Sequence, residues 1–267
     1  MLSDFSFTGK SALITGGSRG LGLSAAKGLM EAGASTVFIT SRSEKACAEA
    51  VEFLNGLSGI KGKAIAVPGD FSKAEDIYRV KKVVQQTTDR LNVVVANAGA
   101  TWGAPFDTHP EKAFDRVLGL NVKGVFFTIQ AFADMLEKAG TSEDPARAIV
   151  LGSVTGLMVS SNGGGGTYGY TASKAAVHHL AEVLAVELGP RNICVNALAP
   201  GFFRSKMANG LIDMIGDENL SEINPRGRLG FAEDIENMIV FLSGKASCYL
   251  NGAIIPLDGG LHLVSKL

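Results

Sequence analysis

The sequence has little of what membrane, secreted and nucleic-acid-binding proteins depend on. No apolar run approaches the about 20 residues that a membrane-spanning helix needs. Residues 1–10 include polar and acidic side chains and lack the apolar core of a secretory signal. Lys and Arg number 25 against 26 Asp and Glu, so there is no basic surplus for nucleic acid or an anionic membrane. We therefore expect neither a nucleic acid nor a membrane as partner.

Cysteine is also scarce. Cys47, Cys194 and Cys248 are odd in number and far apart, which is typical of reduced, buried thiols. They show no metal-ligand spacing, so we expect no metal site. Charged residues make up 19% and hydrophobic residues 46%, which is the balance of a folded chain rather than a disordered one. A length of 267 residues suits one large α/β domain or two small ones.

Glycine is abundant, with 33 residues, and its first cluster lies between a predicted strand and a predicted helix. The strand covers 11–14, the turn Thr-Gly-Gly-Ser-Arg-Gly-Leu-Gly covers 15–22, and the helix runs to Ala32. Glycines let the backbone approach a pyrophosphate, and the helix N-terminus supplies amide donors and the positive end of its dipole. The arrangement predicts the phosphate-binding turn of a dinucleotide site.

The end of the second predicted strand indicates which dinucleotide binds. This strand, 36–40, runs into Ser41 and Arg42. NAD-selective sites place an acidic residue near this point to accept the ribose hydroxyls, and none is present. Arg42, together with Arg19 in the glycine turn, suits a 2′-phosphate and hence NADP(H). The alternative is that Arg42 only begins the next predicted helix, 43–57.

Strands and helices alternate along the rest of the chain, without an internal repeat or a linker. Further strands are predicted over 64–67, 93–96, 148–151, 194–198 and 253–256, and further helices over 73–90, 110–138, 170–188 and 231–242. We therefore expect an α/β fold, a single doubly wound Rossmann domain over 1–267 with a mainly parallel seven-stranded sheet. In such a sheet the ligand lies outside the carboxyl ends of the strands.

Polar and small residues follow several of these strands. Asp70 could contact an adenine amino group or cap the helix that follows it. Asn97, Ala98 and Gly99 would let a flat ring lie against the backbone, unless they only form a tight turn. Asn121 lies in the middle of a long predicted helix with a glycine close by, and both are poor helix formers. A break that frees backbone groups is expected there.

A phenol and an ammonium group lie one helical turn apart at Tyr170 and Lys174. Residues four apart share one face of a helix. A free phenol has a pKa near ~10 and is a poor proton carrier at neutral pH. The neighbouring positive charge is expected to lower the pKa of Tyr170, which suits proton transfer at a carbonyl oxygen. The alternative is a surface Tyr beside a solvated Lys.

Taken together, these motifs resemble the short-chain dehydrogenase/reductase family over essentially the whole chain. The shared features are Thr15-Gly16-x-x-x-Gly20-x-Gly22, Asn97-Ala98-Gly99, Asn121, Ser153, Tyr170-x-x-x-Lys174, Pro200-Gly201 and Asp258-Gly259-Gly260. The segments 168–180 and 200–211 look most similar to fungal members named as 3-oxoacyl carrier-protein reductases of the rhamnolipid type.

The resemblance implies a catalytic tetrad. Tyr170 would protonate the carbonyl oxygen, and Lys174 would lower the pKa of Tyr170 and bind the nicotinamide ribose. Ser153 would hydrogen-bond the substrate oxygen, and Asn121 would hold a water in the proton path. The histidines have no matching role. The implied cofactor-binding residues are Gly16, Ser18, Arg19, Leu21, Ser41, Arg42, Asp70, Phe71, Asn97, Ala98, Gly99, Asn121, Tyr170, Lys174, Pro200, Gly201, Phe203 and Ser205.

Two features depart from the family pattern. The interval between Ser153 and Tyr170 is longer than usual, and the excess falls in the glycine run 163–166. We expect this run to influence substrate range more than folding, because it lacks side chains to pack. Position 205 is Ser where the family commonly has Thr, and the hydroxyl is kept.

The residues and the resemblance predict an NADPH-dependent reductase that converts a ketone or 3-oxoacyl-type substrate to the secondary alcohol. Segment 202–228 would form a lid, with Trp102 and Met158 as neighbours of the substrate mouth. Its apolar side chains favour an apolar or acyl-chain ketone, unless they only pack a small lid helix. Two alternatives stay open: an NAD(P)-dependent alcohol dehydrogenase in the oxidative direction, and a dinucleotide-binding scaffold without turnover. The resemblance also implies a homotetramer or homodimer.

The last three residues, Ser265, Lys266 and Leu267, match the C-terminal tripeptide that the peroxisomal import receptor reads. No N-terminal signal competes, and a short tail follows the final Asp-Gly-Gly motif of the family. We therefore expect a peroxisomal location, with a cytoplasmic one as the alternative. A peroxisomal location would favour a 3-oxoacyl-CoA or a related thioester as substrate.

Overall fold

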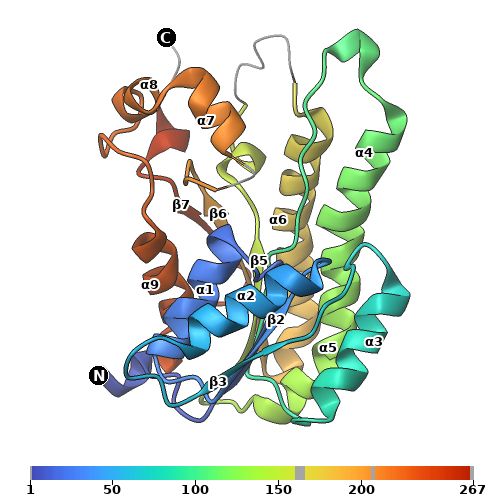
Figure 1. The fold of residues 1–267 in the computed structure, drawn as a ribbon, viewed down its shortest axis with the longest axis vertical. Coiled ribbons are helices and arrows are strands. Elements are labelled where there is room, and N and C mark those ends of the chain that lie inside the picture. Colours follow the sequence, from blue (N-terminus) through green and yellow to red (C-terminus); the bar gives the residue numbers. More distant parts are fainter. Residues whose placement is uncertain (1, 160–165, 206–207, 265–267) are drawn as a thin grey trace.

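The computed structural model describes residues 2–159, 166–205 and 208–264 (Figure 1). Among these residues, seven strands form one sheet in the order β3-β2-β1-β4-β5-β6-β7. The strands are β1 (Ser11–Thr15), β2 (Thr36–Thr40), β3 (Lys63–Ala66), β4 (Val93–Ala96), β5 (Ala146–Leu151), β6 (Ile193–Pro200) and β7 (Ile254–Leu257). All six pairings between them are parallel. The predicted single Rossmann domain with a seven-stranded sheet is confirmed.

Helices fill the connections between the strands and cover both faces of the sheet (Figure 1). They are α1 (Gly20–Glu31), α2 (Glu44–Asn55), α3 (Ala74–Gln85), α4 (Glu111–Leu118), α5 (Val125–Ala139), α6 (Tyr168–Leu188), α7 (Asn209–Ile215), α8 (Asp217–Glu222) and α9 (Ala232–Ser243). One buried core joins α3, α5 and α6 to the sheet, and a second joins α1, α2 and α9 to its other face. The molecule therefore has three layers.

The strands supply both cores because successive side chains of a strand point to opposite faces. Within β1, Leu13 belongs to the core under α5 and α6, whereas Ala12 and Ile14 belong to the core under α1 and α9. All five residues of β1 are buried. This is the pattern of a parallel sheet covered on both sides, where strands read as continuous apolar runs.

The long predicted helix 110–138 is not broken at Asn121 but changes its winding there. α4 passes into a π-helical turn, Gly119–Gly124, which continues directly into α5. Gly124 permits a close approach, since a Cβ at this position would lie 2.5 Å from the carbonyl oxygen of Phe71. A π-helical turn accommodates a local irregularity without ending the helix. The expected break was therefore wrong, although the irregularity lies at the predicted place.

The predicted lid, 202–228, contains the two short helices α7 and α8. Ile212, Leu220 and Leu229 are buried together, and Phe202 and Ile215 pack against them. These side chains form a small core of their own. The packing alternative for the apolar side chains of this segment thus accounts for the observed contacts, and their presence is weak evidence for an apolar substrate.

The sheet order leaves an opening at the carboxyl ends of β1 and β4. The connection after β1 leads to β2 on one side, and the connection after β4 leads to β5 on the other. Where neighbouring strands send their connections in opposite directions, a crevice remains outside the strand ends, and doubly wound proteins bind their ligands there.

Candidate active site

A cavity of about 380 Å³ opens at the carboxyl ends of β1 to β5. The predicted site residues that line it are Gly16, Ser18, Arg19, Leu21, Ser41, Arg42, Asp70, Phe71, Asn97, Ala98, Gly99, Tyr170, Lys174 and Ser205. The predicted residues that do not line it are Asn121, Ser153, Pro200, Gly201 and Phe203. The fold therefore brings together residues that follow five strands, the start of α6 and the segment after β6.

Several further lining residues were not named as site residues from the sequence. They are Gly69, Ala100, Thr101, Leu120, Leu151 and Gly152, whereas Gly20, which also lines the cavity, belongs to the predicted glycine turn. Each of the six lies within two positions of a predicted site residue, so proximity in the chain was the only signal that could have found it. Phe203 lies elsewhere because its side chain is buried and its backbone pairs with Gly230.

In the turn between β1 and α1, no N-cap side chain covers the backbone N–H groups at the start of the helix. Arg19 is the N-cap of α1, and its side chain makes no capping hydrogen bond to the first helical N–H groups. Gly16 has a φ of 65°, a conformation that side-chain-bearing residues rarely adopt. A Cβ at Gly22 would collide with the carbonyl oxygen of Gly16. The residues present therefore fit a phosphate group held by backbone amides at a helix N-terminus.

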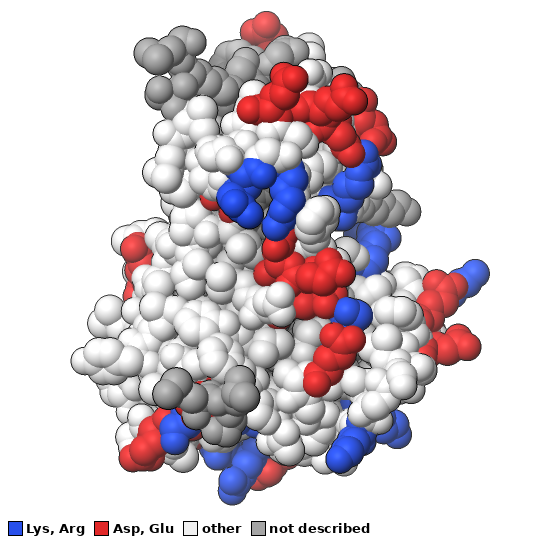
Figure 2. Space-filling model, turned by 90° about the vertical axis from the view of Figure 1, so that its left-hand side faces the viewer, with Lys and Arg blue, Asp and Glu red and all other residues white. Residues whose placement is uncertain are grey.

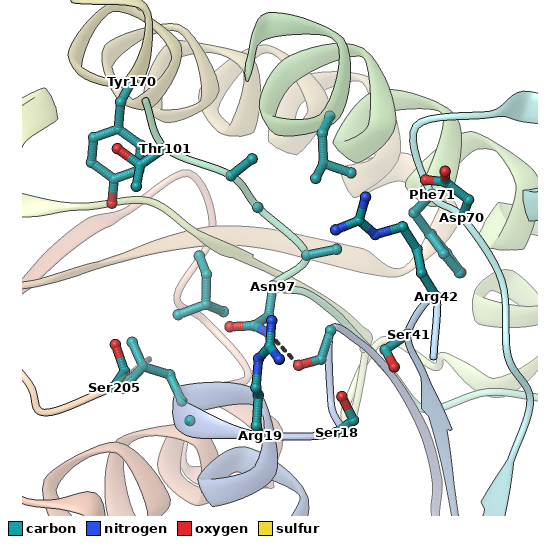
Figure 3. A pocket seen from close by; sticks show the side chains of 18 of the residues that line it. Ser18, Arg19, Ser41, Arg42, Asp70, Phe71, Asn97, Thr101, Tyr170 and Ser205 are labelled. Atoms are coloured by element: carbon teal, nitrogen blue, oxygen red, sulfur yellow. Dashed lines mark hydrogen bonds between the residues drawn. The ribbon is translucent and has the colours of Figure 1, made fainter. Parts of the chain in front are cut away.

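The cavity has two chemically different ends (Figure 3). Tyr170 and Ser205 lie at one end, and Arg42, Asp70 and Phe71 lie at the other, with Asn97 between them (Figure 3). Arg42 is exposed and, among the described residues, forms no ion pair within 4.0 Å, and the same holds for Arg19. Both guanidinium groups can therefore receive an anion, as the 2′-phosphate prediction requires.

Asn97 fastens β4 to the glycine turn. Its side-chain amide donates to the carbonyl oxygens of Thr15 and Gly16 at 2.9 and 3.1 Å. The Thr15 hydroxyl accepts from the backbone N–H groups of Asn97 and Ala98 at 3.0 and 2.9 Å. These bonds occupy the polar side chains, so 97–99 present chiefly backbone to the cavity. The predicted role of 97–99 toward a flat ring stays a prediction, and no turn is assigned to these residues.

Asp70 is not the N-cap of α3, and its predicted contact with an adenine amino group stays a prediction. It lines the cavity, and its carboxylate accepts from the N–H and hydroxyl of Ser72 at 3.1 and 2.7 Å. The N-cap of α3 is Lys73 rather than Asp70. The backbone N–H of Asp70 donates to Asp76 at 2.8 Å, which ties the turn to the first residues of α3.

Tyr170 and Lys174 lie at the end of the cavity near Ser205, which we call the catalytic end after the role predicted for Tyr170. They do not form an ion pair between a phenolate and an ammonium group. The Lys174 ammonium donates to the carbonyl oxygen of Leu151 at 2.6 Å and lies 5.5 Å from the centre of the Tyr170 ring. Burial lowers the pKa of Lys174 to about 8. Burial also raises the pKa of Tyr170 above its usual value, and a hydrogen bond with Ser153 opposes that rise.

The expected lowering of the Tyr170 pKa was therefore wrong for the protein without bound cofactor. Desolvation of the phenolate outweighs the other influences, because a buried charge loses its hydration. The ammonium group that was expected to stabilise the phenolate is directed at a backbone carbonyl instead. The alternative of a surface Tyr beside a solvated Lys is also wrong, since Lys174 is buried.

Asn121 is buried, and its side-chain amide is fully used. Its oxygen accepts from the N–H of Ala100 at 2.8 Å, and its nitrogen donates to the carbonyl of Ala100 and the hydroxyl of Ser173, both at 2.9 Å. The Ser173 hydroxyl in turn donates to the carbonyl of Tyr170 at 2.7 Å. Asn121 thus joins the extension of β4 to the first turn of α6 and positions Tyr170, and its role toward a water stays a prediction.

Ser153 is held from two sides although it does not line the cavity. Its hydroxyl accepts from Thr155, and its N–H donates to Nε2 of His178 at 3.4 Å. His178 is buried, and burial together with the Lys174 charge lowers its pKa to about 4. A side chain at Gly152 would collide with the same imidazole ring. His178 is therefore a neutral support behind Ser153, which sequence reasoning had left without a role.

The comparison with protein families identifies the chain. The model of the short chain dehydrogenase family matches residues 10–215. The chain belongs to the short-chain dehydrogenase family. The chain is therefore an oxidoreductase of this family, and its parallel seven-stranded sheet matches the solved structures of similar proteins.

Individual relatives cover nearly the whole length. A rhamnolipids biosynthesis 3-oxoacyl-[acyl-carrier-protein] reductase of Pseudomonas aeruginosa is 40% identical over 260 residues, covering 97% of this chain and 98% of its own. A sorbose reductase of Schizosaccharomyces pombe is 33% identical over 265 residues, covering 97% and 98%. A solved structure, the NADP active-site complex of RhlG from Pseudomonas aeruginosa, has a TM-score of 0.90 and 38% identity, covering 98% of this chain and all of its own. The expected likeness to reductases of the rhamnolipid type is therefore present, in a bacterial relative.

Charges of both signs are mixed on one face of the molecule. On the face carrying α9 and the α7–α8 segment, acidic and basic side chains lie next to one another around an uncharged area (Figure 2). Ion pairs such as Arg204 with Asp217 and Lys27 with Glu236 account for this mixing. Among the described residues, no group of three or more His, Cys, Asp or Glu could hold a metal ion. No helix among the described residues is both long enough and apolar enough to cross a membrane.

Three predictions fall on residues that the structure does not describe. The glycine run 163–166 lies outside the described residues except for Gly166, whose carbonyl accepts from Ala104. Residues 206–207 of the lid and the terminal tripeptide 265–267 also lie outside them. Trp102 and Met158 are described, and neither lines the cavity.

Proposed function

We propose that this chain is an NADPH-dependent reductase that converts a ketone or 3-oxoacyl-type substrate to the secondary alcohol. The observation that carries the proposal is one cavity with the glycine turn and Arg19 in its middle, Arg42 at one end and Tyr170 with Lys174 at the other (Figure 3). Within the described part of the chain, neither arginine forms an ion pair. A dinucleotide with a 2′-phosphate fits this order of groups.

The cofactor is supported by charge and by a relative. Arg19 and Arg42 line the cavity without carboxylate partners among the described residues, and β2 ends without an acidic residue to accept ribose hydroxyls. A similar solved protein is described as an NADP complex. When bound, the nicotinamide supplies a hydride to the carbonyl carbon.

The protein's part is to manage the proton and the charge at the carbonyl oxygen. Tyr170 donates its phenolic proton to that oxygen as negative charge develops. The raised pKa of Tyr170 keeps the phenol protonated, which is the form that a reduction uses. Ser153 hydrogen-bonds the same oxygen, and the buried Lys174 ammonium adds positive charge beside it. Asn121 and Ser173 hold the first turn of α6 in place.

For the substrate, we favour a 3-oxoacyl thioester over a sugar. The support is the name of the Pseudomonas relative, which covers almost the whole chain. The sorbose reductase among the relatives is the reason to test both classes. The apolar side chains of the lid add little, because Ile212, Leu220 and Leu229 pack against one another.

The test is a panel of 3-oxoacyl thioesters, simple ketones and ketoses, each assayed with NADPH and with NADH. We expect the highest kcat/KM for a 3-oxoacyl thioester with NADPH. Tyr170→Phe should bind NADPH normally, measured by fluorescence titration, and reduce the substrate about 10³-fold more slowly, because only the proton donor is lost. Turnover at the wild-type rate in this variant would refute the mechanism, and preference for NADH or for ketoses would refute the cofactor or substrate assignment.

A further inference from the structure

The Ser153 hydroxyl accepts two hydrogen bonds, and both donors belong to Thr155. Ser153 caps the 3₁₀ turn Val154–Gly156, and its Oγ accepts from the backbone N–H of Thr155 at 3.2 Å. The same Oγ accepts from the hydroxyl of Thr155 at 3.0 Å. A serine hydroxyl has two acceptor positions and one proton. Thr155 therefore fills both acceptor positions, and only the proton of Ser153 is left to make a further bond.

That remaining proton is directed to the catalytic end. Tyr170 has a hydrogen bond with Ser153 that opposes the rise of its pKa. Because Thr155 already fills both acceptor positions of Ser153, the serine is the donor in this bond and the phenolic oxygen accepts. The hydroxyls thus form a chain with one direction, from Thr155 to Ser153 to Tyr170.

We propose that Thr155 is a positioning residue for the reaction, which commits the one remaining proton of Ser153 to the catalytic end, where it is donated to the phenolic oxygen of Tyr170 before substrate binds and to the carbonyl oxygen of bound substrate. The proposal rests on the proposed function, since it assigns a partner to the serine of that mechanism. Thr155 acts through Ser153 and does not itself touch the reacting atoms.

Two physical effects follow from this arrangement. A hydroxyl that accepts hydrogen bonds becomes a better donor, since bonds in a chain polarise one another. A donor whose direction is already set needs no reorientation when negative charge develops on the oxygen in front of it. Without the Thr155 hydroxyl, one acceptor position of Ser153 is open, and its proton can turn away from Tyr170.

The backbone of the turn is held independently of this hydroxyl. His178 accepts from the N–H of Ser153 behind the turn, and the imidazole ring occupies the space beside Gly152 and Gly156. Removal of the Thr155 hydroxyl should therefore alter the hydroxyl chain and leave the main chain of the turn in place. This separation makes the proposal testable with a substitution of nearly equal shape.

The experiment compares Thr155→Val, which keeps the shape and removes the hydroxyl, with Thr155→Ser, which keeps the hydroxyl. Direct loss of an oxyanion donor costs about 10²–10³ in kcat, so loss of its orientation is expected to cost about tenfold. Thr155→Val should lose about tenfold in kcat at unchanged affinity for NADPH, and Thr155→Ser should recover most of it. Equal kcat in wild type and Thr155→Val would overturn the proposal.

A pH profile of alcohol oxidation separates positioning from general damage. Two titratable groups are positioned close to this hydroxyl chain: Lys174, 5.5 Å from the centre of the Tyr170 ring, and His178, which accepts from the N–H of Ser153. Both are unchanged in Thr155→Val, so an upward shift of the apparent pKa of activity reports weaker stabilisation of the Tyr170 phenolate. A lower rate without any such shift would mean that the hydroxyl is structural.

The double variant with Ser153→Ala decides whether Thr155 acts through Ser153. In that background Thr155→Val should cost no more than about twofold, because the hydroxyl has nothing left to orient. A further tenfold loss would contradict the proposal. If the wild type reduces no carbonyl compound of the panel with NADPH, the proposed function fails; if Ser153→Ala and Tyr170→Phe are inactive and Thr155→Val behaves as wild type, only the role of Thr155 fails.

Discussion

Desolvation sets the protonation of the residues around the catalytic end. It raises the pKa of Tyr170, lowers that of Lys174 to about 8 and, with the Lys174 charge, lowers that of His178 to about 4. All three groups are therefore biased toward their uncharged forms.

The depressed pKa of His178 predicts a stability change in acid. Between about pH 6.5 and about pH 4 the unfolded chain binds a proton on this residue and the folded chain does not, so the free energy of unfolding falls as the pH falls. From pH 7 to pH 4.5 the loss should be about 2 kcal/mol. His178→Gln removes the titration and keeps an acceptor for the Ser153 N–H.

The measurement is urea unfolding of wild type and His178→Gln at both pH values. Other groups titrate equally in the two proteins, so the difference between their free energies of unfolding isolates His178. That difference should move by about 2 kcal/mol in favour of the variant at pH 4.5. A constant difference would show that His178 is not a buried neutral group.

Arg42 carries a prediction on cofactor choice. Arg42→Ala should weaken NADPH about 10- to 100-fold and NADH by less than about threefold, since one charge-assisted contact to the 2′-phosphate is lost. Titration of each cofactor against the variant measures this. Arg90→Ala serves as the control, because Arg90 is exposed and does not line the cavity. Equal losses for both cofactors would contradict the charge argument.

At the level of helices and strands, the close contact between two helices depends on glycines, which have no side chain, as much as on apolar side chains. α1 packs on α9 at Gly28, where a Cβ would lie 2.9 Å from the carbonyl oxygen and 3.0 Å from the Cα of Glu236. Both neighbouring atoms belong to the backbone of α9 and cannot move without the helix. The π-helical turn at Gly119–Gly124 follows the same logic, since Gly124 lies against the backbone of Phe71.

Two Gly→Ala variants test this reading. In a helix interior Ala is preferred to Gly by about 1 kcal/mol, so the sign of the effect reports the surroundings. Gly28→Ala should destabilise the protein by about 1–3 kcal/mol because α1 and α9 must separate. Gly210→Ala in α7, where nothing lies within 4 Å of the added carbon, should be neutral or stabilising. Thermal unfolding measures both, and a stabilised Gly28→Ala would mean that the two helices can shift.

The whole molecule is a single three-layer domain, and its assembly and location remain predictions. Exposed apolar residues on α6, Val183 and Val186, suit the expected homodimer or homotetramer. Members of this family act on small molecules, and the mixed surface charge agrees with that kind of partner. The predicted peroxisomal address, 265–267, lies outside the described residues.

The address is tested with fluorescent proteins fused to the N-terminus of two forms, the full chain and a chain lacking 265–267. The full form should give a punctate signal that overlaps a peroxisomal marker, and the shortened form a diffuse one, because the receptor reads the free C-terminal tripeptide. Replacing Lys266 with Glu is a matched control that keeps the length. A diffuse signal from the full form would refute the peroxisomal location and leave the cytoplasmic alternative.

Local patterns in the sequence determined most of the fold and the outline of the site. Three features depend only on residues that are close in the chain: the glycine turn, the alternation of strands with helices, and the Tyr170–Lys174 spacing. They can therefore be predicted from the sequence. Only the tertiary structure decided what surrounds these groups. The rise of the Tyr170 pKa, the bond from Lys174 to Leu151 and the support of Ser153 by Thr155 and His178 come from burial and the precise course of the backbone. Desolvation and hydrogen-bond direction depend on packing between distant segments, and no local spacing encodes them.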